Sequence, residues 1–224
     1  MQRRLRALRD ALPKGPVPVA DAVLATFIGI ATVIFLHDNV LQTTPVTGIS
    51  MSPTLSPHYE ETGAKDSILW RKYRATRNLK RGDVILFDSP TNPENVSVKR
   101  VVGLSGDEIV LDPRRRPKDF ENGRVSEGGK RWDAMKRKGK GRVVVPEGHV
   151  WVEGDNWRKT LDSNDYGPIS KALIQGKAVA KCWPLSEFGR KVGGAEDGYK
   201  NRTRVRKGVR RRVGEEVERW WEVD

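Results

Sequence analysis

A long apolar run lies near the N-terminus of the chain. Residues 17–36 read VPVADAVLATFIGIATVIFL, and Asp21 is the only charged residue among them. At about 1.5 Å rise per residue, such a helix spans the roughly 30 Å hydrocarbon core of a bilayer. The pattern predicts a transmembrane anchor over residues 17–37. A cleaved signal peptide and a buried soluble helix are the alternatives, although no clear small-x-small cleavage site follows the run.

After the apolar run the pattern changes to short stretches rich in Val, Ile and Trp, separated by Gly, Pro, Asn and Asp. This punctuation is typical of short antiparallel strands, and helical periodicity is weak outside the anchor. The sequence therefore predicts a mainly β domain over residues 41–188, either a barrel or a sandwich. The expected strands are Ser67–Arg71, Asp83–Phe87, Val96–Val102, Glu108–Leu111, Arg142–Val145 and His149–Glu153.

The charge of the chain is unevenly distributed. Its 42 Lys and Arg against 29 Asp and Glu give a net charge of +13, which first suggests a nucleic acid or an anionic membrane as partner. The excess lies in a basic N-terminal arm (1–16), a basic insertion (112–142) and a basic C-terminal extension (189–224), whereas the remaining chain is slightly acidic. We expect these segments to be solvated, with the extension disordered. No RNP-type aromatic motif or zinc-finger spacing accompanies the charge, so no nucleic-acid partner is predicted.

The basic arm also bears on the orientation of the anchor. Under the positive-inside rule, the arm stays on the matrix or cytoplasmic side of the membrane, and everything after the anchor faces the opposite compartment. An Arg-rich start that is nearly free of acidic residues also resembles a mitochondrial targeting segment.

Cysteine and histidine are too scarce for several kinds of site. Cys182 is the single cysteine, which excludes an internal disulfide framework and a multi-Cys zinc site. His37, His58 and His149 are scattered, and none has a recognisable Ser/His/Asp setting. We therefore expect no metal, no cofactor and no His-based triad.

Three stretches carry candidate chemistry. They are Gly48–Leu55 (GISMSPTL), Val98–Asp107 (VKRVVGLSGD), and Gly154–Asn156 (GDN) followed by Thr160–Asn164 (TLDSN). Each taken singly reads as a structural turn or strand. In this order and spacing, behind an N-terminal anchor, they resemble the type I signal peptidase family of Ser/Lys proteases. The segments RGDV at 81–84 and PEGHVWV at 146–152 are similar to further family motifs, and the resemblance covers roughly residues 20–185.

The resemblance implies a signal-peptidase-like antiparallel β domain with one N-terminal transmembrane helix, in which Ser50 is the nucleophile and Lys99 its general base. A serine hydroxyl needs an adjacent base, and a lysine can accept a proton only when it is neutral. Burial would have to depress the lysine pKa from its reference of about 10.4 by several units. Strand alternation puts only Ser97 and Val101 on the face of Lys99, so a solvated strand lysine remains the alternative. Arginine could not replace it, because guanidinium does not deprotonate in proteins.

Family resemblance also assigns supporting residues. It places the Thr160 hydroxyl against the lysine amine, lets Asp162 and Ser163 brace the same loop, and pairs Asp155 with Arg100. Asn164 stands where the family commonly has an arginine, which removes the cation expected beside Asp162.

The resemblance extends to the oxyanion hole and the substrate. Gly48 occupies the position where some bacterial members supply a hydroxyl to the oxyanion hole, so the Ser50 backbone N–H is expected to be the main donor. The substrate is expected to bind as an extended strand against a sheet edge, with Ile49, Met51 and Pro53 contacting it.

Within the family, Asp-Ser-Asn followed by Tyr-Gly-Pro-Ile-Ser looks like subunit 2 of the mitochondrial inner membrane proteases. This implies removal of sorting sequences from preproteins at the outer face of the inner membrane, contact with inner membrane lipid, and a heteromer with the homologous subunit 1. A bacterial-type signal peptidase and a catalytically silent, membrane-tethered scaffold that binds anionic lipid are the alternatives.

Overall fold

The computed structural model describes residues 18–111, 141–194 and 203–208. The chain divides into two compact units, residues 1–41 and residues 42–224. The predicted arm (1–16) lies outside the described residues, as does the predicted insertion (112–142) except for its last two residues.

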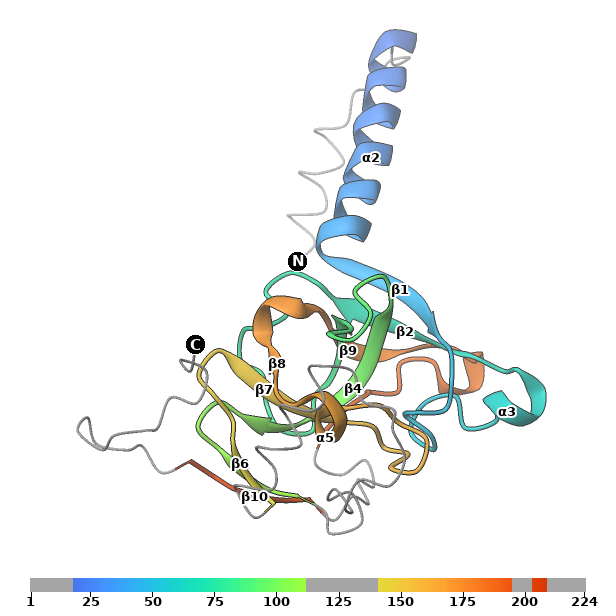
Figure 1. Cartoon of the computed structure of the whole chain (residues 1–224). Coiled ribbons are helices and arrows are strands. Elements are labelled where there is room, and N and C mark those ends of the chain that lie inside the picture. Colours follow the sequence, from blue (N-terminus) through green and yellow to red (C-terminus); the bar gives the residue numbers. More distant parts are fainter. Residues whose placement is uncertain (1–17, 112–140, 195–202, 209–224) are drawn as a thin grey trace, which may run out of the picture. The chain divides into compact units, whose positions relative to one another are not determined.

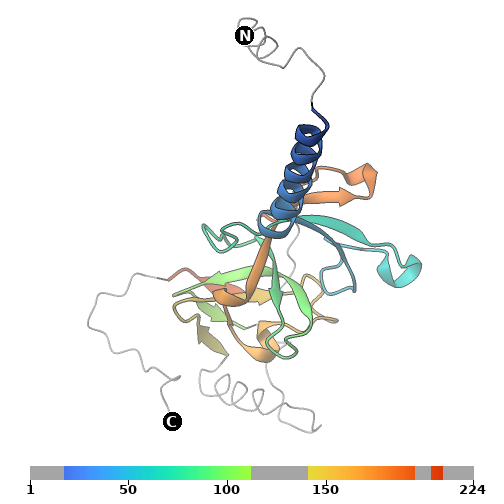
Figure 2. The same ribbon diagram turned by 90° about the horizontal axis from the view of Figure 1, so that it is seen from above.

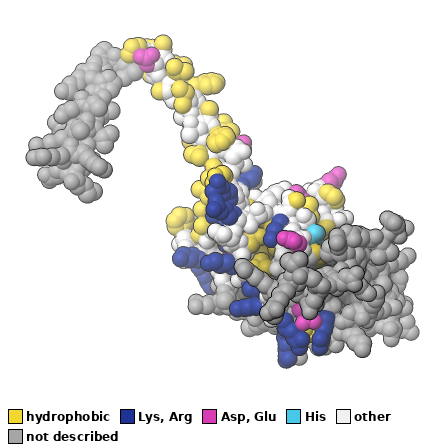
Figure 3. Space-filling model, turned by 90° about the vertical axis from the view of Figure 1, so that its left-hand side faces the viewer, with side chains coloured by type: hydrophobic (Ala, Val, Ile, Leu, Met, Phe, Trp, Pro, Cys, Tyr) yellow, Lys and Arg dark blue, Asp and Glu magenta, His cyan; other side chains and the backbone are white. Residues whose placement is uncertain are grey.

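The first unit consists of one described helix, α2 (Val19–Asn39). Large apolar side chains are exposed all along it, as the space-filling view in Figure 3 shows, and none of its residues is buried. The hydroxyls of Thr26 and Thr32 donate to carbonyls one turn earlier, at 2.8 and 2.7 Å, so these polar groups are satisfied within the helix. The helix is long and apolar enough to cross a membrane, and it begins and ends two residues later than the predicted anchor.

The second unit is built from two antiparallel sheets (Figures 1 and 2). The larger sheet has seven strands in the order β1-β2-β9-β3-β4-β7-β8, and the smaller has the order β10-β5-β6. Every strand pair with a determined register is antiparallel. The predicted mainly β, antiparallel class is therefore confirmed. The strands are β1 (Leu41–Val46), β2 (Asp66–Arg71), β3 (Val84–Asp88), β4 (Val96–Leu104), β5 (Glu108–Val110), β6 (Arg142–Val144), β7 (His149–Glu153), β8 (Ile169–Ser170), β9 (Ile174–Trp183) and β10 (Arg204–Arg206).

Among the described residues, four short helices connect these strands. They are α3 (Tyr59–Thr62), α5 (Ser163–Tyr166) and the 3-10 turns η2 (Lys171–Leu173) and η3 (Leu185–Glu187). Of these, α5 bears most directly on the site, because its N-terminal end carries the Asp-Ser-Asn motif. Asp162 caps this helix, and Asp165 completes a capping box with it.

Three buried apolar clusters hold the sheets together. The first packs Trp70 of β2 against Met51 and Leu55. The second surrounds Phe87 of β3, and the third packs Trp151 of β7 against the small sheet. Gly103 on β4 allows this last packing, because a Cβ there would collide with the side chain of Ile109. The clusters lie on both sides of the strand that carries Lys99, so β4 is fixed from both faces.

The six strands expected from the sequence are all present, with ends shifted by at most two residues. The sequence did not predict β1, β8, β9 or β10. In β1 the sequence LQTTPV is mostly polar, and β9 (IQGKAVAKCW) places Gly and Lys at positions that face inward. These strands are stabilised by their neighbours in the sheet rather than by their own apolar pattern.

The predicted C-terminal extension differs from the expectation over its described residues. Val192 is buried in the first cluster, Lys191 pairs with Ala180 of β9, and β10 adds a strand to β5. The Gly208 N–H donates to Asp107 at 3.0 Å. Residues 189–194 and 203–208 are therefore folded onto the β domain, because backbone pairing, the burial of Val192 and the hydrogen bond from Gly208 to Asp107 offset their poor apolar content.

Candidate active site

A pocket of about 440 Å³ contains both residues of the predicted dyad. Its walls come from β1, from the first half of β4 and from the turn that carries Ser50. The lining residues are Gln42, Thr44, Pro45, Val46, Thr47, Ser50, Leu86, Val96, Ser97, Val98, Lys99 and Gln175. The sheet thus brings together two motifs that are 49 residues apart in the chain.

Lys99 and Ser50 are within hydrogen-bond distance of each other. The Lys99 Nζ atom lies 2.8 Å from Ser50 Oγ and 3.1 Å from the carbonyl oxygen of Val98. Lys99 is only 5 % exposed, and on β4 it stands opposite Ile85 of β3. The strand pattern left open whether this lysine is buried, and the structure shows that it is. Burial disfavours the charged ammonium and so favours the neutral amine that a general base requires.

The turn after β1 presents Ser50 to the pocket. Gly48 has φ +85°, a left-handed conformation that favours glycine, and the Ser52 N–H donates to the Ile49 carbonyl at 3.0 Å. The Ser50 carbonyl accepts the N–H of Asn156 at 3.0 Å, which ties the turn to the loop after β7. Among the described residues the Ser50 N–H has no acceptor, and it therefore remains available to an oxyanion.

Ile49, Met51 and Pro53, which were expected to contact substrate, do not line this pocket. Met51 is 1 % exposed and packs in the first apolar cluster with Leu55. Met51 and Leu55 therefore anchor the turn to the core, whereas Pro53 is exposed. Residues of β1 and β4 form the walls in their place.

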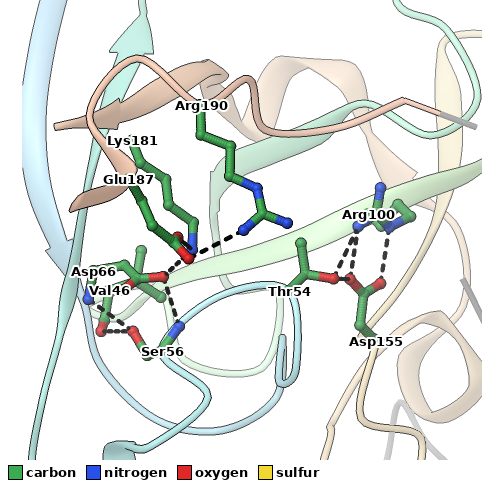
Figure 4. Close-up of polar contacts among 9 residues, drawn as sticks. All are labelled: Val46, Thr54, Ser56, Asp66, Arg100, Asp155, Lys181, Glu187 and Arg190. Atoms are coloured by element: carbon green, nitrogen blue, oxygen red, sulfur yellow. Dashed lines mark hydrogen bonds and ion pairs between the residues drawn. The ribbon is translucent and has the colours of Figure 1, made fainter. Parts of the chain in front are cut away.

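Arg100 points away from the pocket and forms the ion pair expected with Asp155 (Figure 4). Its Nε and Nη2 atoms donate to the two carboxylate oxygens at 2.8 and 2.7 Å, and both side chains are almost fully buried. Thr54 donates its hydroxyl to the same carboxylate at 2.5 Å. The bidentate pair joins the residue after Lys99 to the loop after β7, and Thr54 ties the end of the Ser50 turn to the same carboxylate.

Asp162 and Ser163 brace the end of β7, next to the pocket. The Asp162 carboxylate accepts the Gly154 N–H at 3.0 Å, and Ser163 Oγ accepts the Val152 N–H at 2.9 Å. Asn164 donates its side-chain amide to Asp162 at 3.0 Å. A neutral amide donor therefore reaches Asp162 from the position where an arginine was expected.

Thr160 lies beside the backbone of Ser50, because both lie against Gly154. A Cβ on Gly154 would collide with the Thr160 side chain and with the Ser50 carbonyl, so only glycine allows this approach. The Thr160 hydroxyl is buried and has no hydrogen-bond partner among the described residues. Its role in orienting Lys99 stays a prediction.

Comparison with known proteins agrees with this arrangement. The family model for signal peptidase, peptidase S26, matches residues 19–183. The chain belongs to this family. The mitochondrial inner membrane protease subunit 2 of Saccharomyces cerevisiae is 38 % identical over 156 residues, which cover 69 % of this chain and 75 % of that protein.

Other members of the family match in the same region. Subunit 2 of the Schizosaccharomyces pombe protease is 34 % identical and covers 72 % of this chain and 75 % of its own. Human mitochondrial inner membrane protease subunit 1 is 40 % identical over 50 % of this chain and 54 % of its own. A signal peptidase I from Enterococcus faecalis, a solved structure, is 26 % identical and covers 45 % of this chain and 96 % of its own, with a TM-score of 0.29.

The peptidase contains a second buried polar network that the sequence motifs did not reveal (Figure 4). Lys181 of β9 places its ammonium 2.7 Å from Asp66 and 2.5 Å from Glu187, and its side chain is 5 % exposed. Asp66 accepts the Ser56 N–H at 2.9 Å, and the Ser56 hydroxyl donates to the Val46 carbonyl at 3.0 Å. The network therefore ties together the two ends of the turn that carries Ser50.

Glu153 is the other supporting residue that the sequence did not indicate. Its carboxylate is fully buried and accepts hydrogen bonds from Trp151 (2.9 Å), Asn164 (3.1 Å) and Thr203 (2.8 Å). Asn164 thus bridges Asp162 and Glu153. A lone acidic residue at the end of an apolar strand is the sequence signal that could have found it.

Proposed function

We propose that the chain is a membrane-anchored serine endopeptidase that uses Ser50 and Lys99 to remove sorting sequences from preproteins delivered to the mitochondrial intermembrane space. The observation that carries this proposal is the 2.8 Å separation of Lys99 Nζ and Ser50 Oγ, with the lysine buried in the wall of an open pocket. Membership of the signal peptidase family supports the reaction class. The names of the related proteins support the location.

The proposed reaction follows from the positions of these groups. Ser50 Oγ attacks the carbonyl carbon of the scissile peptide bond while its proton passes to the neutral amine of Lys99. The Ser50 N–H stabilises the oxyanion of the tetrahedral intermediate. The intermediate collapses to an acyl-enzyme as Lys99 returns the proton to the leaving amine. Lys99 then deprotonates a water molecule, which hydrolyses the ester.

Two free strand edges border the pocket and suit an extended substrate. β1 is the edge strand of the large sheet, and β7 pairs with β4 only from Arg100 onward. The Val96–Lys99 part of β4 therefore has no strand on that side among the described residues. A substrate strand can use these backbone groups for hydrogen bonds, with short side chains such as Thr44, Thr47 and Ser97 around it.

The test compares purified full chain with variants on a preprotein that carries a bipartite sorting sequence. Ser50→Ala and Lys99→Ala should each lower cleavage by roughly three orders of magnitude or more. Ser52→Ala, in the same turn, is the matched control and should retain activity. Lys99→Arg keeps the positive charge but cannot accept a proton, and it should be as inactive as Lys99→Ala.

Cleavage by Ser50→Ala at the wild-type rate would refute the mechanism. An active Lys99→Arg variant would refute the role of the lysine as a base while leaving the nucleophile in place. The proposed heteromer with subunit 1 is tested separately, by purifying the chain from mitochondria with and without that subunit and comparing the rates.

A further inference from the structure

The loop between β2 and β3 carries a concentration of positive charge that the overall charge balance obscures. Residues 71–81 read RKYRATRNLKR, and no acidic residue occurs between Asp66 and Asp83. Arg81 is engaged by Asp107 at 2.5 Å. Five cations remain without an ion pair to any carboxylate in the described part of the chain, namely Arg71, Lys72, Arg74, Arg77 and Lys80.

The loop is held in place by apolar packing and by backbone hydrogen bonds. Ala75 is buried in the second apolar cluster, and Leu79 packs against the same cluster. The N–H groups of Ala75 and Arg77 each donate to a carbonyl three residues earlier, at 3.0 Å. Anchored at these two points, the loop exposes Arg74, Arg77 and Lys80, while Tyr73 is 55 % exposed with the Arg74 guanidinium 5.0 Å from its ring centroid.

The position of this loop in the β domain follows from the pairing of β1 and β2. Ser56 links Val46, the last residue of β1, to Asp66, the first residue of β2. Trp70, near the end of β2, donates its indole N–H to Thr44 at 2.8 Å. The two strands therefore run in opposite directions, and the basic loop leaves β2 at the end of the sheet where β1 begins (Figure 1).

The start of β1 is also where the chain emerges from its apolar helix. Only Val40 and Leu41 separate Asn39, the last residue of α2, from Gln42. An extended chain reaches at most about 3.6 Å per residue, so this end of the sheet stays close to the membrane boundary when α2 spans the bilayer.

We propose that the loop over residues 71–81 binds the anionic headgroups of the membrane in which α2 is anchored. A polybasic segment close to a bilayer is attracted by acidic phospholipid, and an exposed tyrosine suits the headgroup layer. Two carboxylates, Asp88 and Glu94, belong to the β3–β4 connection at the same end of the sheet, and Asp88 already accepts a hydrogen bond from Gln175 at 2.6 Å. At this end of the sheet, four cations (Arg71, Lys72, Arg74 and Arg77) outnumber the two acidic groups. Lys80 lies toward the other end, because the next residue, Arg81, binds Asp107 in the turn after β4.

This contact would hold the pocket at a defined height above the membrane. Gln42 and Thr44 of the pocket wall lie on the strand next to the one that leads into the loop. The proposal depends on α2 being a membrane anchor and does not depend on peptidase chemistry.

The experiment uses full chain reconstituted in vesicles, with Ser50→Ala throughout so that no cleavage contributes. Cys182→Ser and Thr76→Cys allow a fluorophore to be placed on the loop. The vesicles contain phosphatidylcholine alone or phosphatidylcholine with phosphatidylglycerol, each with a trace of headgroup spin-labelled lipid. We expect stronger quenching of the fluorophore in the anionic vesicles, falling to the neutral-vesicle level at about 1 M salt.

Charge variants make the test specific. The double variant Arg74→Gln with Arg77→Gln should lower the equilibrium constant for contact between the loop and the anionic membrane by about 25-fold. Each cation close to an anionic surface contributes about fivefold to this constant. Arg204→Gln with Arg206→Gln removes the same charge from β10 of the other sheet, and it should leave the quenching unchanged. Equal quenching in both vesicle types would overturn the proposal. An equal loss of quenching in the control variant would also overturn it.

Discussion

The buried network beneath the Ser50 turn makes a strong and quantitative prediction. Lys181→Met replaces an ammonium that contacts both Asp66 and Glu187 with an apolar side chain of similar length. The substitution leaves the Asp66 carboxylate buried with the Ser56 N–H as a remaining donor. An uncompensated buried charge is expensive, so the protein should be strongly destabilised.

The magnitude follows from the exposure of each partner. The Asp66 side chain is 9 % exposed, so breaking its pair with Lys181 should cost about 3–5 kcal/mol, the usual range for a buried ion pair that loses one member. Glu187 is 33 % exposed and can turn toward water, which places the cost near the lower end. At about 2–4 °C per kcal/mol for a protein of this size, the midpoint of unfolding should fall by roughly 6–20 °C.

Two matched variants distinguish the cost of breaking the buried Lys181–Asp66 pair from the cost of removing a positive charge elsewhere. Arg190→Gln also removes one positive charge from the network, but this arginine is 65 % exposed and contacts only the outer carboxylate of Glu187. It should cost about 0–1 kcal/mol. The double variant Asp66→Asn with Lys181→Met removes both buried charges, and it should be less destabilised than Lys181→Met alone.

The assay is urea and thermal unfolding of the full chain in detergent, followed by circular dichroism, with cleavage kinetics below the melting temperature. Because Ser56 links Asp66 to Val46, loss of the ion pair should loosen the turn that carries Ser50 and lower kcat. Equal effects of Lys181→Met and Arg190→Gln on stability would refute the predicted cost of breaking the buried pair. A double variant that is at least as destabilised as Lys181→Met alone would refute it as well.

Two further predictions concern Thr160 and Asp107. If the buried Thr160 hydroxyl orients the lysine, Thr160→Val should lower kcat about 10–100-fold and Thr160→Ser should restore it, with the folded fraction measured by circular dichroism as the control. Burial would raise the pKa of Asp107, but hydrogen bonds from Arg81 and from backbone N–H groups outweigh it and hold the pKa below its usual value. Asp107 therefore stabilises the fold above its unfolded pKa of about 4, and this contribution is lost as the pH falls through the lower folded value. Asp107→Asn should cost about 2 kcal/mol in urea unfolding at pH 7, and a difference that does not shrink below about pH 4 would contradict this account.

The sequence predicted the strands with continuous apolar patterns, and it indicated Ser50 and Lys99 as a candidate dyad, for two different reasons. VILF in β3 and HVWVE in β7 are rich in β-branched and aromatic residues, so their local pattern suffices. Ser50 and Lys99 lie in short motifs, and a motif can be read without knowing the fold. Both sources of information are local in the chain.

The sequence could not indicate residues that act through contacts between distant strands. Lys181 follows the small residues of AVAKC, and nothing near it in the chain shows that its ammonium meets Asp66, which lies on the neighbouring strand β2. The interpretation of Met51 as a substrate contact was wrong for the same reason. An apolar residue beside a nucleophile can face the pocket or the core, and only the packing of β2 against the turn shows that it faces the core.

The C-terminal segment also contributes hydrogen bonds to buried charged groups, although it lies beyond the region that the family model matches. The match ends at residue 183, and three later residues contact charged groups behind the pocket. Glu187 binds Lys181, the Gly194 carbonyl accepts from Arg100 at 3.4 Å, and the Thr203 hydroxyl donates to Glu153. These charged groups are buried, and the later residues add hydrogen-bond partners to those that the preceding part of the chain supplies. The described part of the C-terminal segment therefore belongs to the peptidase domain, because the ion pairs that position the Ser50 turn and β4 are completed by it.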